Sequence, residues 1–95
     1  MPEFTDQVIV LTGASQGIGK ALAIALAPQK PTLVLAARDQ AALNAVEAQC
    51  RALGAITFVF PTDVTDEGQG HRLFEATLNA FGRVDILINN AGMAH

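Results

Sequence analysis

Largely apolar runs alternate with helix-like segments along this chain, and that alternation constrains the fold more than any other feature. The runs cover residues 7–11, 32–37, 55–60 and 84–89, and apolar residues follow one another directly in them. Strands with this pattern are buried on both faces, as in a parallel sheet. The segments between them place apolar residues at helical spacing. The sequence therefore predicts a chain of the form βαβαβαβ.

Right-handed connections between parallel strands limit how these elements can be arranged. Two of the helices then lie on one face of the sheet, and the third crosses to the other face. The predicted strand order is 3-2-1-4, which makes the fold a doubly wound parallel sheet of the α/β class. A chain of 95 residues has room for one such domain at most.

Prolines, a glycine and an aspartate mark the ends of the helices. Pro28 and Pro31 end the first helix, predicted over 17–29, and Gly54 follows the second. Asp39 is predicted to cap the second helix, because its carboxylate can accept hydrogen bonds from the free N–H groups of the first turn. The residues expected to face the sheet are Ile18, Leu22, Ala25 and Leu26 in the first helix, Leu43, Val46, Cys50 and Leu53 in the second, and Leu73, Phe74, Leu78 and Phe81 in the third.

The composition argues against several classes of protein. Hydrophobic residues make up 51% of the chain and charged residues 16%, which suits a packed core rather than disorder. The net charge is −3 and no run of Lys or Arg occurs, so we expect no nucleic-acid partner. Cys50 is the only cysteine, which leaves no internal disulfide and no cysteine-based zinc site. With no signal peptide and no apolar run long enough for a bilayer, we expect a cytoplasmic protein without a membrane partner.

Residues 12–19, TGASQGIG, place three glycines between the first predicted strand and the first predicted helix. Glycine allows a tight turn and lets backbone N–H groups approach a phosphate without a side chain in the way. The spacing does not match a P-loop, because Ala14 stands where that motif needs Gly and Ala21 where it needs Ser or Thr. It also differs from the G-x-G-x-x-G dinucleotide motif. By itself the stretch fits either a phosphate-binding turn or a flexible connection.

The position of the glycine stretch in the predicted sheet favours a ligand site. In doubly wound sheets, ligands lie beyond the carboxyl ends of the strands, where the strand order reverses. Here the order reverses between the first and fourth strands. The glycine stretch follows the first strand, and NNAG, residues 89–92, follows the fourth. The two loops are therefore expected to meet at one crevice.

TGASQGIG at 12–19, DV at 63–64 and NNAG at 89–92 closely resemble, in order and spacing, the motifs of the short-chain dehydrogenase/reductase family. Proteins of that family are NAD(P)-dependent oxidoreductases on a Rossmann fold. The resemblance covers the whole chain and implies a nicotinamide dinucleotide as cofactor. The cofactor-binding residues that it implies are Thr12, Gly13, Ser15, Gln16, Gly17, Ile18, Gly19, Arg38, Asp63, Val64, Asn89, Asn90, Ala91 and Gly92.

The resemblance also implies roles for the two loops. The glycines form the turn around the pyrophosphate, and the backbone N–H of Ile18 is directed at it. Residues 89–92 line the cofactor ribose. The hydroxyl of Thr12 ties the glycine loop to residues 89–92, and the alternative for Thr12 is an ordinary threonine at a strand end.

Adenine recognition is implied for the residues that follow the third strand. Asp63 would accept a hydrogen bond from the adenine amino group, and the N–H of Val64 would reach a ring nitrogen. The alternative for Asp63 is a cap of the third helix, a position that Thr65 or Asp66 could also fill.

The end of the second strand indicates which dinucleotide is preferred. A carboxylate there binds the ribose 2′-hydroxyl of NAD, whereas an arginine accommodates the 2′-phosphate of NADP. This chain has Ala-Ala-Arg at 36–38, and Asp39 follows in a capping position. Arg38, assisted by the hydroxyl of Ser15, is predicted to bind the 2′-phosphate, and the alternative is a solvated pair with Asp39. NADP(H) is the predicted cofactor and NAD(H) the alternative, although Gln16 stands where many NADP-binding members have a basic residue.

The residues that catalyse hydride transfer in the resembled family are not found in this sequence. Those proteins use a tyrosine as acid/base, a lysine that lowers its pKa and a serine that orients the substrate, all downstream of NNAG. This chain has no tyrosine, and its lysines are Lys20 and Lys30. We assign no catalytic residue and no metal site.

Residues 1–95 are therefore expected to be the N-terminal part of one NAD(P)-binding domain, inactive alone. The full protein would be a homo-oligomeric reductase or dehydrogenase acting on a carbonyl or alcohol. The alternative is a stand-alone, non-catalytic nucleotide-binding or interaction module.

Overall fold

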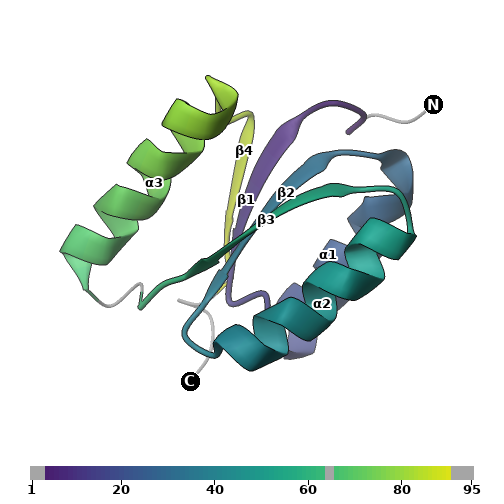
Figure 1. Cartoon of the computed structure of the whole chain (residues 1–95), viewed down its shortest axis with the longest axis horizontal. Helices are drawn as coiled ribbons and strands as arrows, with labels where there is room; N and C mark the ends of the chain where they lie inside the picture. Colours follow the sequence, from purple (N-terminus) through teal and green to yellow (C-terminus); the bar gives the residue numbers. More distant parts are fainter. Residues whose placement is uncertain (1–3, 64–65, 91–95) are drawn as a thin grey trace.

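The computed structural model describes residues 4–63 and 66–90, and Figure 1 shows them as a sheet with helices on both sides. The strands are β1 (Val8–Thr12), β2 (Thr32–Ala37), β3 (Ile56–Pro61) and β4 (Ile86–Asn89), and the α-helices are α1 (Gly17–Leu26), α2 (Gln40–Ala52) and α3 (Glu67–Phe81). A short 3-10 turn, η1 (Ala27–Gln29), follows α1. Neighbouring strands are parallel, and their order is β3-β2-β1-β4. The predicted fold class and strand order are confirmed.

The register of the parallel strands brings their carboxyl ends to one edge of the sheet. Thr12, the last residue of β1, is paired with Ala36 of β2 and with Asn89 of β4. Ala37 of β2 is paired with Pro61 of β3. The segments that follow all four strands, including the glycine stretch, therefore begin along the same edge.

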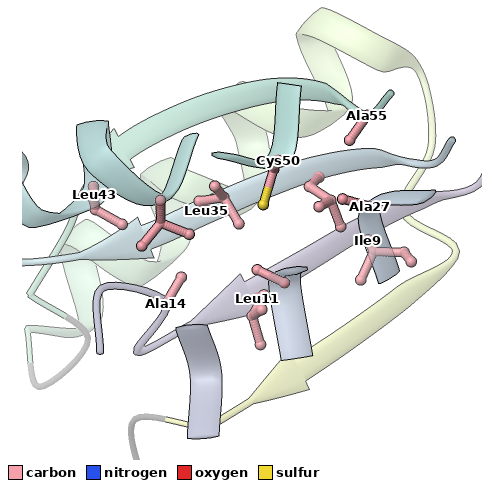
Figure 2. Packing of buried hydrophobic residues seen from close by; sticks show 11 residues of the cluster. Ile9, Leu11, Ala14, Ala27, Leu35, Leu43, Cys50 and Ala55 are labelled. Atoms are coloured by element: carbon pink, nitrogen blue, oxygen red, sulfur yellow. The ribbon is translucent and has the colours of Figure 1, made fainter. Parts of the chain in front are cut away.

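Helices α1 and α2 cover one face of the sheet, and α3 lies on the other (Figure 1). The core under α1 and α2 includes Ile9 and Leu11 of β1, Leu35 of β2, and Leu43 and Cys50 of α2, and in Figure 2 Ile9 lies beside Ala27. Both faces of β1 and β2 are buried, which explains why these strands are apolar throughout. The core on the α3 side consists of Val8, Val10, Val34, Ala36 and Leu73, with Phe58, Phe60, Phe81 and Val84 packed against it.

Helix α1 buries a face that differs from the one predicted by apolar spacing, whereas α2 buries Leu43, Val46 and Cys50 and α3 buries Leu73, as predicted. Helix α1 ends at Leu26, three residues earlier than predicted, and its buried residues are Gly19 and Ala23. Small residues let the helix backbone lie close to the strands, and this outweighs the burial of the larger side chains nearby. The predicted cap of α2 by Asp39 is confirmed. The residues that were expected in the core but are exposed are Ile18 (66%), Ala25, Leu53 (42%), Phe74 (42%) and Leu78 (39%).

Strand β4 forms one edge of the described sheet, and the apolar surface beside it is only partly covered. A groove of about 190 Å³ lies between β4 and α3, and Leu87, Leu73 and Phe74 are among the residues that line it. Leu87 is 55% exposed. An edge strand with apolar side chains and open backbone groups favours pairing with another chain.

We expect the 95-residue chain to self-associate through β4. Leu87→Lys places a charge at this edge and is expected to produce a monomer at modest loss of stability, because the side chain is already half exposed. Size-exclusion chromatography with light scattering measures the mass, and hydrogen exchange over residues 85–89 reports whether β4 is covered. Ile56→Lys is the matched control, since Ile56 is 63% exposed on β3, the opposite edge strand. A sharp monomer peak for the unmodified chain, with slow exchange over 85–89, would contradict the prediction.

Candidate functional site

Gly13, in the loop between β1 and α1, and Gly17, the first residue of α1, adopt a backbone conformation that L-amino acids rarely adopt. The φ angle is 65° at Gly13 and 59° at Gly17. A side chain at either position would strain the backbone whatever the space around it. A Cβ at Gly17 would meet no atom within 4 Å. Gly17 is therefore required by the shape of the turn, and the space beside it is open.

Gly19 is required for a different reason. It lies in the first turn of α1, and a Cβ there would overlap the carbonyl oxygen of Gly13 and lie 2.8 Å from Nδ2 of Asn90. The space that the missing side chain leaves is filled by the loop's own backbone rather than kept free for a ligand. Gly19 therefore lets α1 begin directly against the glycine loop.

In the described part of the chain, the start of α1 differs from those of α2 and α3 in having no side-chain cap. Gln16 occupies the N-cap position of α1 in an extended conformation, and its side chain makes no capping bond. By contrast, Asp39 accepts a hydrogen bond from the N–H of Ala42 at 3.0 Å, and Asp66 accepts one from the N–H of Gly68 at 2.9 Å. The first turn of α1 also contains no acidic residue. Its N–H groups and the positive end of the helix dipole are thus available to an anion.

Hydrogen bonds join the glycine loop to the end of β4. Thr12 donates through Oγ1 to Oδ1 of Asn89 at 2.9 Å. Asn90 donates through Nδ2 to the carbonyl oxygen of Gly13 at 3.4 Å. Both pairs are 77 residues apart in the sequence. The glycine loop and the end of β4 are therefore in contact, as predicted for the place where the strand order reverses.

Arg38 follows β2 at the same edge of the sheet as the glycine loop. The N–H of Ala14 in that loop donates to the carbonyl oxygen of Ala36 at 3.2 Å, which fixes the loop beside the end of β2. Arg38 is exposed and Ser15 is half-buried. Within the described residues no ion pair joins Arg38 to Asp39, whose carboxylate caps α2 instead. A guanidinium placed in this way is suited to a phosphate.

Asp63 follows β3, and the first turn of α3 holds its backbone in place. The N–H of Asp63 donates to Oε1 of Gln69 at 2.8 Å, and its carbonyl oxygen accepts from the N–H of Asp66 at 3.0 Å. Asp66, not Asp63, caps α3. Gln69 was not among the predicted site residues, although the sequence contains a pattern that could have indicated it. An acidic N-cap residue followed three positions later by glutamine is close to the capping-box pattern.

Some predicted site residues have no structural description. Val64, Ala91 and Gly92 lie outside the described residues. Between residues 4 and 90, with 64 and 65 left out, no group of three His, Cys, Asp or Glu side chains could hold a metal ion. In that same part, no helix is both long and apolar enough to cross a membrane. The candidate site is therefore built from the glycine loop and the residues that follow β2, β3 and β4.

Known proteins with similar sequences are dehydrogenases and reductases. The family model of short chain dehydrogenases matches residues 7–95. Dehydrogenase/reductase SDR family member 7 of Homo sapiens is 43% identical, with 97% of this chain and 28% of that protein aligned. Sepiapterin reductase of Chlorobaculum tepidum is 36% identical, with 90% of this chain and 38% of that protein aligned. The chain thus spans between 25% and 38% of the length of these and other curated relatives.

Solved structures with the same fold contain two different dinucleotides. A metagenomic short-chain oxidoreductase in complex with NADP has a TM-score of 0.84 at 37% identity, over 88% of this chain and 38% of that one. A short chain dehydrogenase/reductase from Burkholderia phymatum in complex with NAD has a TM-score of 0.83 at 41% identity, over 92% of this chain and 31% of that one. The sheet and helices of Figure 1 therefore also occur in proteins crystallised with either dinucleotide.

Proposed function

This chain belongs to the short-chain dehydrogenase family, and we propose that it is the dinucleotide-binding part of an oxidoreductase that transfers hydride between NADP(H) and a carbonyl or alcohol. Residues 1–95 would form the N-terminal part of one NAD(P)-binding domain, in keeping with the 25–38% of the relatives' length that they span. One observation carries the proposal. The uncapped start of α1 is held against the end of β4, at the edge where the strand order reverses.

The residues of this edge fit the parts of a nicotinamide dinucleotide. The N–H groups at the start of α1, including that of Ile18, would bind the pyrophosphate in the turn made by Gly13 and Gly17. The carboxylate of Asp63 would accept a hydrogen bond from the adenine amino group, and residues 89–92 would line the ribose. When bound, the nicotinamide supplies or accepts the hydride. The described residues of this chain bind and orient the dinucleotide.

Titration with NADPH tests the proposal. The chain contains no Trp and no Tyr, so the fluorescence of the reduced nicotinamide is read without background from those side chains. We expect the full-length gene product to bind NADPH saturably, with one NADPH per protein chain. The absence of binding, in a sample that circular dichroism shows to be folded, would overturn the proposal.

NADP(H) rather than NAD(H) is the proposed cofactor because of the end of β2. This strand ends in two alanines, and the next residue is Arg38 rather than a carboxylate. The guanidinium is not engaged by the neighbouring Asp39, which caps α2. Structural neighbours contain NAD or NADP, so the proposed preference rests on this residue of the chain itself.

Arg38→Ala is expected to lower the preference for NADPH over NADH by about 10- to 150-fold, because a hydrogen bond to a charged group contributes roughly 1.5–3 kcal/mol. The quantity to measure is the ratio of the two dissociation constants in the same preparation. Arg51→Ala is the matched control, since Arg51 is an exposed arginine in the last turn of α2. If the ratio of the NADPH and NADH dissociation constants is the same in Arg38→Ala as in the unmodified protein, Arg38 does not bind the 2′-phosphate.

A further inference from the structure

The composition of strand β4 leaves its register open. Ile86, Leu87 and Ile88 are all apolar, and moving the strand by two residues along β1 would keep the same faces of the sheet covered. Apolar packing alone therefore does not select the observed pairing. The register matters, because it places Asn89 opposite Thr12 at the candidate site.

Asp85, directly before β4, makes contacts that do select a register. Its carboxylate oxygen Oδ2 accepts a hydrogen bond from the N–H of Val8 at 2.7 Å, and its own N–H donates to the carbonyl oxygen of Val8 at 2.9 Å. One residue thus binds both backbone groups of the first residue of β1. A slip of two residues would break both bonds, which ties this end of β4 to one position on β1.

Arg83 holds the carboxylate of Asp85 in place. Its Nε lies 2.9 Å from Oδ2, and its Nη2 lies 2.9 Å from Oδ1. This two-point contact fixes the plane of the carboxylate while Oδ2 accepts from Val8. Among the described residues, Asp6 also attracts Arg83. The side chain of Asp85 is 23% exposed and that of Arg83 is 56% exposed, so water reaches this contact.

The charge of Asp85 persists to acidic pH. The hydrogen bonds from Arg83, followed by the one from the Val8 N–H, lower the pKa of this carboxyl below its ordinary value. A folded-state pKa below the unfolded one means that the contact contributes stability above the ordinary carboxyl range, and that the contribution is lost as pH falls through the lowered value. At neutral pH the contact is therefore complete.

We propose that Asp85 is a positioning residue for the candidate site. By fixing β4 against β1 at one end of the strand, it places the two asparagines that follow against the glycine loop at the other end. Asn89 is four positions from Asp85, about 13 Å along an extended strand, so Asp85 would act without touching a nucleotide. The inference rests on the proposed function, because those asparagines belong to the proposed nucleotide site.

Asp85→Ala tests the inference with two readouts in the protein as its gene produces it. The NMR resonances of the Asn89 and Asn90 side-chain amides report the register, and they are expected to shift. The dissociation constant for NADPH is expected to rise at least about tenfold, the effect of one charge-assisted hydrogen bond. Asp85→Asn keeps an oxygen that can accept from the Val8 N–H but loses the two-point contact with Arg83, so both readouts should be restored only in part.

Thr57→Val is the matched control for a purely structural effect. It removes the 3.0 Å hydrogen bond between Thr57 and Glu47 at the opposite edge of the sheet. We expect this variant to have a lower melting temperature but unshifted resonances of the Asn89 and Asn90 side-chain amides. The inference is overturned if Asp85→Ala leaves those amides in place, or raises the NADPH dissociation constant no more than Thr57→Val does.

Two further outcomes keep the test decisive. If Asp85→Ala does not fold, Arg83→Met takes its place, because it removes only the contact that orients the carboxylate. Unshifted resonances of the Asn89 and Asn90 side-chain amides in that variant would overturn the inference. If the unmodified protein does not bind NADPH, the proposed function fails, whereas the amide resonances still decide whether Asp85 sets the register.

Discussion

Gly19→Ala is expected to weaken NADPH binding through the shape of the loop rather than through contact with the ligand. The new Cβ would overlap the carbonyl oxygen of Gly13, which is backbone and cannot rotate aside. The loop must shift, and the hydrogen bond from Asn90 and the turn at Gly17 shift with it. Overpacking typically costs about 1–3 kcal/mol, so we expect binding to weaken by about 5- to 150-fold. Fluorescence titration and thermal unfolding of one sample measure both effects.

Gly70→Ala is the matched control for this substitution. Gly70 lies within α3, and a Cβ there would meet no atom within 4 Å. Alanine in a helix is more stable than glycine by about 0.5–1 kcal/mol, so this variant should melt slightly higher and bind NADPH as before. Normal NADPH affinity in folded Gly19→Ala would remove the glycine loop from the site, and a lower melting temperature with normal affinity would limit Gly19 to folding.

The 95-residue chain by itself is expected to bind NADPH without oxidising it. In the family, as the sequence motifs imply, a tyrosine acts as acid/base with a nearby lysine. This chain contains no tyrosine, and Lys20 and Lys30 lie in or beside the first helical region. The measurement is the loss of NADPH absorbance with a panel of aldehydes and ketones. Steady turnover that survives repeated purification would contradict the prediction.

A nucleotide titration on the same sample is the control for that assay, because it separates an inactive site from an unfolded chain. The reading frame beyond codon 95 distinguishes the two candidate functions. A continuing frame that encodes Tyr-x-x-x-Lys would favour the oxidoreductase. A stop codon would favour a stand-alone binding module.

The sequence predicts the sheet well because the relevant signals are local. Residues 32–37 form β2 with the predicted bounds, since Pro31 and Arg38 interrupt the apolar run on both sides. Asp39 caps α2 as predicted, because capping involves residues only three positions apart. The strand order then follows from the handedness of the connections.

The face that α1 buries could not be read in the same way. Residues 17–26 are apolar nearly all round the helix. Spacing alone therefore does not decide whether Ile18 or the small residues Gly19 and Ala23 are buried. The close approach of helix and sheet makes that choice in three dimensions. Asp85 illustrates a second limit, because its partner Val8 is 77 residues away and no local pattern connects them.

The open start of α1 would make the folding of this chain depend on its ligand. A bound phosphate would do for α1 what Asp39 does for α2. A ligand that binds only the folded form adds about 2.7 kcal/mol to the free energy of unfolding at a hundred times its dissociation constant. That is a large share of the roughly 5–15 kcal/mol that holds a typical domain together. Because cells degrade unfolded chains, the amount of this protein would then rise and fall with the nucleotide pool, and the missing cap would link protein turnover to redox metabolism.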